Sequence, residues 1–414
     1  MAEASQQIRG GAEQPPVRPG RRLPFETAPT LSAIGLVVVA SVSWLLLGGS
    51  LPNVPGGPTG PGGDGGPVRT ATPSNVVIVD PRTNVPGTLV YAKDGNIWVQ
   101  TRDQAHQLTN SGLDSMPAWS PDCSSVYYIS TTPATGNPRW ITNGEVRFYN
   151  LTYPSLLSIP AAGGDFQQLM KGQIRDGQYT WSYFIREPAI APDGRTAALI
   201  SDGPDPRGSD ITLKLLSLGN LKLTDPKLPE IESLGHQDPA WSPDGKVLLY
   251  VRNSREGTRG TPTIMRYTLA TGKTAAMTTG GYMAPSWSRD GRYVAATKTT
   301  SFGTDVVILD ARNGTELIKL TNDELSFNPV WSPLMDSVAY FKLDHGLVDL
   351  WLIPLTGTAP NWTVGQPIAL TISAGLDAPS RPGWFIPPDQ LPALSTPTPA
   401  TTPGAPGASP SSAP

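Results

Sequence analysis

Residues 239–245 read Pro-Ala-Trp-Ser-Pro-Asp-Gly, and weaker copies of this stretch recur along the chain. The tryptophan position is occupied in the five copies by Trp119, Ile190, Trp241, Trp287 and Trp331, and each copy has a proline two residues earlier. The later copies follow one another at about 45 residues, a period typical of rings built from four-stranded sheets. The repeat therefore predicts an all-β protein, a β-propeller.

Each copy is expected to be a turn that joins two strands. Proline followed by aspartate favours a type I turn, and the glycine after it accepts a positive φ. Alternating apolar residues follow directly, as in residues 246–251 (KVLLYV) and 337–341 (SVAYF), which is the pattern of a half-buried strand. A third strand (as in residues 305–309) and a fourth (as in residues 317–321) complete a unit. We interpret the tryptophan as a wedge between neighbouring blades.

The two ends of the repeat region are predicted to form one further blade together. Residues 86–110 supply three strands without a preceding motif, and Pro382-Gly383-Trp384 is a motif start with no blade behind it. Joining them closes the ring and protects its edge strands. The prediction is a six-bladed propeller of four-stranded blades in residues 86–387. Seven blades are the alternative if the long interval between the first two copies contains another.

In these motifs the chain resembles the Pro-x-Trp-Ser-Pro-Asp-Gly repeats of the TolB C-terminal propeller and its relatives. The resemblance covers about residues 86–387. It implies the propeller fold, which occurs in periplasmic scaffold proteins and ahead of the catalytic domain of prolyl-oligopeptidase-like enzymes. Departures from the repeat fall at Ile190, Arg289 and Leu334-Met335, and Cys123 takes a glycine position. We expect those turns to be less regular, and Cys123 to be a partly exposed free thiol.

The long first interval is predicted to hold an insertion on blade one. Asn143-Gly144 is a strong hairpin signal, and residues 171–186 form a long connection after it. Both parts are rich in aromatic residues. Packing of the insertion against blade one is the favoured interpretation. The alternative is a partner- or carbohydrate-binding patch, because Tyr and Trp anchor interfaces; its residues would be Trp140, Tyr179, Trp181 and Tyr183.

A membrane anchor is predicted ahead of the propeller. Residues 31–51 (LSAIGLVVVASVSWLLLGGSL) are mostly apolar, and as a helix they would span about 31 Å, the thickness of a bilayer core. Arg18, Arg21 and Arg22 precede this segment, so the positive-inside rule places the N-terminus in the cytoplasm and the propeller outside. A cleaved signal peptide is the alternative, although its apolar core is usually shorter and ends at a small-residue cleavage site.

Three flanking segments are too polar and too rich in Gly and Pro to bury a core. Residues 1–30 are predicted to be a disordered cytoplasmic tail, and residues 52–85 a Gly/Pro-rich linker. Residues 388–414 are Pro/Thr/Ser-rich and are predicted to be a disordered tail.

Composition argues against several functions. Basic and acidic residues number 31 and 34, without a basic face, so we expect no nucleic-acid partner. The three histidines, His106, His236 and His345, lie on different predicted blades outside any metal motif, so we expect no metal or other cofactor. No Gly-x-Ser-x-Gly elbow occurs. We expect no catalytic residues, although paired carboxylates from different blades would leave no motif.

The mouth of the central channel is the predicted functional surface. In propellers of this family the residues just before each motif proline approach the channel opening. Glu187 and Asp238 would form an acidic sector there, with cationic residues beside them. The candidate ligand-binding rim consists of Arg186, Glu187, His236, Asp238, Asn328 and Arg381. A peptide segment is the expected ligand and a cation the second choice; a water-filled polar rim is the alternative.

Together these features predict a single-pass membrane protein that displays its propeller outside the cell membrane. The expected function is a non-catalytic scaffold that binds a protein, a peptide or an envelope polymer. The alternative is a propeller-type hydrolase or lyase that acts on glycans or peptides.

Overall fold

The computed structural model describes residues 81–138, 148–203, 211–226, 228, 233–254 and 261–394. The chain separates into two units, Met1–Pro55 and Gly56–Pro414, and the described residues all belong to the second. The predicted cytoplasmic tail and anchor, most of the linker and most of the C-terminal tail therefore lie outside the described residues. Within the described segments, no helix has the length and apolar character needed to cross a bilayer.

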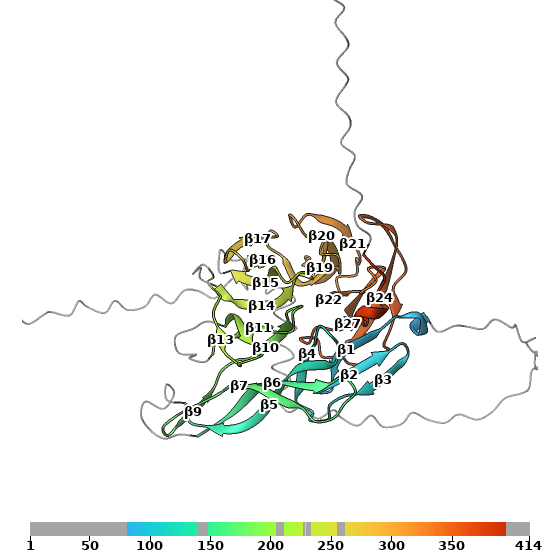
Figure 1. The fold of residues 1–414 in the computed structure, drawn as a ribbon. Coiled ribbons are helices and arrows are strands. Elements are labelled where there is room, and N and C mark those ends of the chain that lie inside the picture. Colours follow the sequence, from blue (N-terminus) through green and yellow to red (C-terminus); the bar gives the residue numbers. More distant parts are fainter. Residues whose placement is uncertain are drawn as a thin grey trace, which may run out of the picture. The chain divides into compact units, whose positions relative to one another are not determined.

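The described strands form a ring of antiparallel sheets (Figure 1). From the channel outward, blade one consists of β4 (Asp114–Trp119), β5 (Ser125–Gly136), β6 (Tyr149–Pro160) and β7 (Gln167–Lys171). Blade two consists of β10 (Arg186–Ile190), β11 (Thr196–Ser201), β12 (Thr212–Ser217) and β13 (Leu223–Thr224). Blade three consists of β14 (Ser233–Trp241), β15 (Val247–Ser254), β16 (Pro262–Thr268) and β17 (Lys273–Ala276).

The other blades follow the same order. Blade four consists of β18 (Tyr282–Trp287), β19 (Tyr293–Thr299), β20 (Thr304–Asp310) and β21 (Glu316–Lys319). Blade five consists of β22 (Ser326–Trp331), β23 (Ser337–Asp344), β24 (Leu347–Thr358) and β25 (Asn361–Val364), and β26 (Ile368–Ala369) also pairs with β24. Blade six consists of β27 (Gly383–Phe385), β1 (Thr88–Lys93), β2 (Asn96–Thr101) and β3 (Gln104–Gln107). Each innermost strand contacts the innermost strands of both neighbouring blades, so the six-bladed prediction is confirmed.

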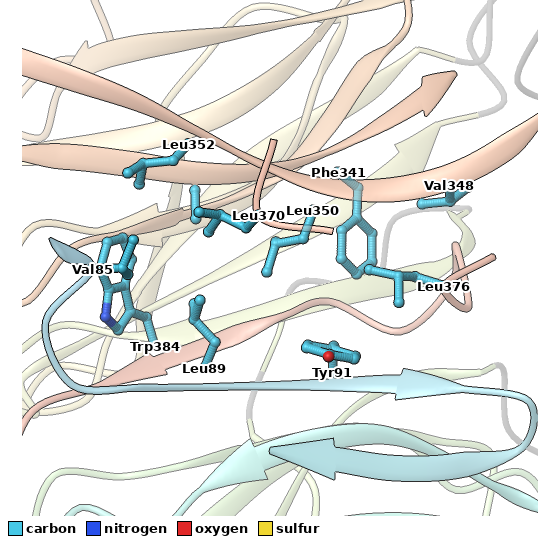
Figure 2. Packing of buried hydrophobic residues seen from close by; sticks show 11 residues of the cluster. Val85, Leu89, Tyr91, Phe341, Val348, Leu350, Leu352, Leu370, Leu376 and Trp384 are labelled. Atoms are coloured by element: carbon cyan, nitrogen blue, oxygen red, sulfur yellow. The ribbon is translucent and has the colours of Figure 1, made fainter. Parts of the chain in front are cut away.

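Blade six closes the ring by combining both ends of the domain, as predicted. The last strand, β27, pairs with the first, β1, so that Leu89 lies opposite Trp384. The indole N–H of Trp384 donates to the carbonyl oxygen of Pro86 at 2.8 Å. Figure 2 shows Leu89 and Tyr91 of β1 packing with Leu350 of blade five in a buried cluster. Burial of each such side chain contributes about 1.5–3 kcal/mol, which holds the closing blade to its neighbour.

The repeated motif folds into a turn held by its own serine and aspartate. Ser242 Oγ donates to Asp244 Oδ1 at 2.7 Å and accepts the N–H of Val247 at 2.9 Å. Gly245 then adopts a φ of 68°. Cys123 and Met335 adopt the same conformation at the glycine position, with φ of 60° and 61°.

Leu334 replaces the motif aspartate of the fifth copy, and Ser332 Oγ bonds to Asp336 Oδ1 instead. The expectation that the departing turns are less regular is nevertheless wrong for the backbone at Cys123 and Met335. Their N–H groups bond to the carbonyls of Ser120 and Ser332 at 2.9 and 2.8 Å, as the N–H of Gly245 bonds to Ser242 at 2.9 Å. The serine–aspartate network holds the backbone in place, so the glycine is preferred there but not required. Cys123 is a half-buried free thiol, as predicted.

Two motif tryptophans, Trp241 and Trp287, bond to the preceding blade. The indole N–H of Trp241 donates to the carbonyl of Ala189 at 3.0 Å, and that of Trp287 donates to the carbonyl of Ala240 at 3.1 Å. Both acceptors lie on the innermost strand of the preceding blade. At Trp241 and Trp287 the predicted wedge is thus also a hydrogen-bonded link between blades.

The long first interval is an insertion that packs on blade one. Strands β5 and β6 pair over their whole length of 12 residues and extend beyond the blade. A separate hairpin, β8 (Gln173–Asp176) and β9 (Tyr179–Ser182), contacts both of them through β9. Asn143-Gly144, the predicted hairpin turn, lies outside the described residues.

The channel rim and the two ends of the domain lie on opposite faces of the ring. Thr88, at the start of β1, pairs with Phe385, at the end of β27, so the domain begins and ends at one edge of blade six. At the opposite edge, the carbonyl of Ala92 accepts the N–H of Asp377 at 2.9 Å, shortly before Arg381. The pre-proline rim therefore lies on the face away from the domain's two ends, and the motif turns lie on the same face as those ends.

Candidate ligand-binding channel

The innermost strands of blades one to five each carry a bulge at the motif proline. In β14, Gln237 pairs with Val251 and Ala240 pairs with Leu249, so one residue of β14 is extra. A positive φ is uncommon for residues with a Cβ, and a residue before proline favours extended backbone. The surrounding sheet therefore holds a strained residue at each of these five bulges. These residues, with φ between 49° and 55°, are Met116, Glu187, Asp238, Ala284 and Asn328.

The N–H groups of the bulge residues bond to side chains of the preceding blade. Met116 donates to Ser380 Oγ at 2.8 Å, and Glu187 donates to the sulfur of Met116 at 3.3 Å. Asp238 donates to Glu187 Oε2 at 2.5 Å, and Ala284 donates to Asp238 Oδ2 at 2.8 Å. We call this head-to-tail series, which runs from blade six to blade four, the rim relay.

The rim relay ends at Ala284 because a methyl group accepts no hydrogen bond. The N–H of Asn328 in blade five bonds instead to Thr297 Oγ1 of β19, at 3.0 Å. The side-chain nitrogen of Asn328 donates to the carbonyl of Ala378 at 2.9 Å. Blade five is thus tied to both of its neighbours by a different set of bonds.

Arg381 of blade six reaches over the channel mouth. Its Nη2 donates to the carbonyl of Pro285 at 2.6 Å, and its Nη1 lies 3.9 Å from Asp238 Oδ1. Those partners belong to blades four and three, which do not adjoin blade six. The guanidinium therefore places a positive charge opposite the acidic side chains of the rim relay.

A cavity of about 310 Å³ lies within the channel below this mouth. Its wall comes from the innermost strands of five blades and the segments next to them, and it is made mainly of prolines and tryptophans. The charged members of the wall are Glu187 and Arg381. The apolar members include Pro117, Pro188, Pro239, Pro285, Pro382, Trp241 and Trp287. Such a wall suits an apolar or extended ligand with charged groups at the mouth.

Among the groups at the channel mouth, Glu187 has the most strongly shifted pKa. Burial raises its pKa to about 7, and the nearby carboxylate of Asp238 acts in the same direction. The positive charge of Arg186, whose Nη2 lies 3.3 Å from Glu187 Oε1, partly opposes this rise. A carboxyl group with this pKa can donate as well as accept a hydrogen bond at neutral pH. Within the described ranges, no three His, Cys, Asp or Glu side chains gather closely enough to hold a metal ion.

Of the six predicted rim residues, Glu187, Asp238 and Arg381 meet at the channel mouth. Arg186 lies beside Glu187 with nearly half of its side chain exposed. Asn328 faces blade six through Ala378.

His236 does not reach the rim. Its Nδ1 accepts the N–H of Leu213 at 3.1 Å, and its ring packs on Tyr250 with centroids 4.8 Å apart. It lies between two register shifts of β14, one after Ser233 and one after Gln237, and its ring is directed between blades two and three. Burial, reinforced by Arg252 and Lys214, lowers the pKa of His236 to about 4, so the ring is neutral at physiological pH.

The predicted aromatic patch is largely interior. Trp181 and Tyr183 are only 2% and 8% exposed, and the hydroxyl of Tyr183 donates to the carbonyl of Lys171 at 2.9 Å. Strand β9 of the hairpin contacts β5 and β6, whereas Tyr183 packs in the buried cluster between blades one and two, so these side chains do not form an exposed aromatic patch. Tyr179 is half-buried, and Trp140 lies outside the described residues.

Three groups at the channel were not among the six predicted rim residues. The sulfur of Met116 and the hydroxyl of Ser380 are acceptors in the rim relay, and the carbonyl of Pro285 holds Arg381. Met116 and Ser380 precede motif prolines, so their location is readable from the repeat. Their roles as hydrogen-bond acceptors depend on the bulges, which turn backbone N–H groups away from the hydrogen bonds of the sheet. The bulges have no local sequence signal.

The fold defines the class of this protein as a six-bladed β-propeller. No protein-family model matches the chain. No curated protein matches its sequence.

Among solved structures, TolB from Acinetobacter baumannii is similar, with a TM-score of 0.51 and 17% identity over 72% of this chain and 66% of that one. The chain thus spans slightly less than two thirds of that TolB. A putative TolB from Agrobacterium tumefaciens is similar with a TM-score of 0.47 and 16% identity, over 69% of this chain and 88% of that one. An oligogalacturonate lyase in complex with manganese has a TM-score of 0.44 and 16% identity, over 65% of this chain and 74% of that one. The predicted TolB-like propeller is confirmed as a fold.

Proposed function

We propose that the propeller is a non-catalytic docking module that captures an extended segment of a partner protein at its channel mouth. One observation carries this proposal: a mouth of mixed charge stands over a cavity of about 310 Å³ with a wall of proline and tryptophan. The TolB-like fold supports it, because propellers present such mouths as binding surfaces.

The chemistry of the mouth suits a peptide. An extended peptide offers backbone donors and acceptors together with alternating side chains, which need both polar and apolar contacts. Trp241 and Trp287 supply broad apolar faces in the wall. Arg381 on one side and Glu187 and Asp238 on the other would pair with side chains of opposite charge, which favours one orientation of the ligand.

The same proposal places the module outside the cell membrane, anchored by residues 31–51. It rests on the apolar length of that segment and on the arginines that precede it. The partner would then be a protein of the cell envelope.

A second candidate function is a propeller-type hydrolase or lyase that acts on glycans or peptides. One observation favours it: Glu187, with a pKa raised to about 7, lies beside Asp238 at the channel mouth. A carboxylic acid held protonated near neutral pH, next to a second carboxyl group, is the arrangement of a general acid and its partner.

Capture of the partner tests the docking proposal. The full chain, carrying an affinity tag, is expressed in its own cells, treated with a reversible cross-linker and recovered, and bound proteins are identified by mass spectrometry. The doubly substituted variant Glu187→Gln, Asp238→Asn keeps hydrogen-bond acceptors but removes the negative charge. Asp165→Asn, at an exposed aspartate in a turn of blade one, is the matched control.

We expect one envelope protein to be recovered with the wild type and the control, and at least about tenfold less of it with the double variant. Equal recovery with all three chains would rule out the rim as the docking site. The purified chain is also incubated with glycan and peptide panels between pH 5 and 8. Turnover that is lost in Glu187→Gln would establish the enzyme instead.

A further inference from the structure

A second cavity, of about 380 Å³, lies beside the channel mouth. The extended parts of β5 and β6 form one wall, and the chain that leaves β9 and enters β10 forms the other. Thr131 and Pro154 come from the first wall, and Tyr183, Ile185 and Arg186 come from the second. Met116 lines both this cavity and the channel. The insertion on blade one therefore creates a pocket that the repeated blades alone would not form.

Hydrogen bonds hold the second wall in a fixed position. The N–H of Tyr183 donates to the carbonyl of Gly172 at 3.0 Å, and its hydroxyl donates to the carbonyl of Lys171 at 2.9 Å. The N–H of Phe184 donates to Asp202 Oδ1 at 2.7 Å, and its carbonyl accepts Ser201 Oγ at 2.5 Å. A cavity with bonded walls is preformed, as small-molecule sites usually are.

The lining combines an apolar interior with one cation. Ile129, Pro154 and Ile185 are apolar, while Thr131 and Ser182 add hydroxyl groups. Every other lining residue is uncharged, so Arg186 supplies the only formal charge among the described residues of the wall.

The guanidinium of Arg186 has capacity for a second partner. Its Nη2 is 3.3 Å from Glu187 Oε1, and 45% of its side chain is exposed. A guanidinium carries five N–H donors in a planar fork that matches a carboxylate. One contact with Glu187 therefore leaves donors available on a residue that lines the cavity.

We propose that this cavity binds a carboxylate carried on a short apolar or aromatic body. The carboxylate pairs with Arg186, and the apolar body lies against Ile129, Pro154 and Ile185. A free small acid and the C-terminal residue of a peptide share this chemistry. The cavity adjoins the channel at Met116, but Arg186 does not line the channel cavity, so the proposal does not require that the channel captures a peptide.

Titration of the purified full chain with N-acetylphenylalanine tests the site, by calorimetry and by chemical-shift changes. We expect saturable binding of one equivalent, and binding about tenfold or more weaker for N-acetylphenylalanine amide, which lacks the charge. Arg186→Gln is expected to weaken binding of the acid by the same factor. Arg175→Gln, an exposed arginine on β8 outside the cavity, is the matched control and is expected to bind as the wild type does.

Thr131→Phe fills the cavity and keeps Arg186 in the sequence, and we expect it to abolish binding. Thermal unfolding of every variant checks that the fold is retained. A tripeptide ending in phenylalanine separates the two sources: tighter binding than the free acid assigns a peptide C-terminus, and weaker binding assigns a small acid. The proposal is overturned if Arg186→Gln and Arg175→Gln bind the acid equally, or if neither the acid nor the tripeptide binds the wild type at millimolar concentration.

Discussion

The carboxylate of Glu187 in blade two accepts the backbone N–H of Asp238 in blade three, with 2.5 Å between Oε2 and the nitrogen. The donor is a bulge residue with a φ of 55°, so its N–H has left the sheet ladder. The same pair of residues thus joins two blades and lines the channel mouth. A substitution at either residue can therefore change both the stability of the ring and the binding of a ligand. Variants at this pair have to be chosen so that the two effects are measured separately.

Removing the acceptor of that bond should destabilise the ring. We expect Glu187→Ala to lower the free energy of unfolding by about 1–3 kcal/mol, because it leaves the N–H of Asp238 unpaired. Glu187→Gln keeps an acceptor and should retain most of the stability. Chemical denaturation at pH 7 measures both variants. Equal losses for the two would show that the hydrogen bond contributes nothing.

The raised pKa of Glu187 predicts a pH dependence of stability. Its pKa rises from the usual 4.5 to about 7, so the folded state keeps a proton that the unfolded chain releases. The protonated Glu187 side chain contributes fully to the free energy of unfolding below pH 4.5. This contribution is lost as the pH rises through 7. The free energy of unfolding of the wild type minus that of Glu187→Gln should therefore fall by on the order of 3 kcal/mol over this range. If this difference in the free energy of unfolding stays constant from pH 4 to 8, the predicted role of Glu187 is contradicted.

His236 should act in the opposite direction over nearly the same range. Its pKa falls from the usual 6.5 to about 4, so only the unfolded chain takes up a proton as the pH drops from 6.5 to 4. Stability is lost over that drop, by on the order of 3 kcal/mol. His236→Asn keeps an acceptor for the N–H of Leu213, and unfolding curves of this variant should lack the loss. Between pH 4.5 and 6.5 the two groups offset each other in the wild type, so single variants are needed to see either.

Two motif tryptophans should respond differently to the same substitution. Trp241 donates its indole N–H to Ala189, whereas the buried indole nitrogen of Trp331 has no hydrogen-bond partner among the described residues. Trp241→Phe loses a bond, and Trp331→Phe removes an unpaired buried donor. We expect Trp241→Phe to be about 2 kcal/mol more destabilising, measured by denaturant unfolding. If the order is reversed, packing rather than hydrogen bonding decides the role of these residues.

The glycine position of the motif turn offers a test of backbone strain. A Cβ at Gly194 would meet no atom within 4 Å, so Gly194→Ala measures only the cost of its φ of 67°. We expect a loss of about 1 kcal/mol. Cys123→Gly relieves similar strain, which offsets the greater freedom of glycine in the unfolded chain, so it should not destabilise. Thermal unfolding of both variants decides, and a marked loss with Cys123→Gly would mean that the Cys123 side chain stabilises its turn.

The ring itself was predictable because its signals are local and repeated. The proline and tryptophan of each motif mark an innermost strand, and Trp384 without a following blade indicated closure with residues 86–110. The channel mouth was predictable in part for the same reason. Glu187 and Asp238 each precede a motif proline, and both line the mouth.

Other parts of the site depend on contacts between distant segments. His236 and Asp238 are two residues apart, yet a bulge between them sends one into a blade interface and the other to the mouth. Trp181 and Tyr183 look like surface aromatics until the extended β5–β6 pair covers them. The second cavity forms between that pair and the entry to blade two, and no single stretch of sequence encodes it.

The pairing of β1 with β27 also constrains how the protein is made. Five blades can form in order as the chain is synthesised, but the sixth lacks its innermost strand until residues 383–385 emerge. Until then β1 is left with a bare edge that can pair with strands of other chains. A chain that stops before Gly383 therefore leaves the ring open, with β1 exposed to pairing with other chains.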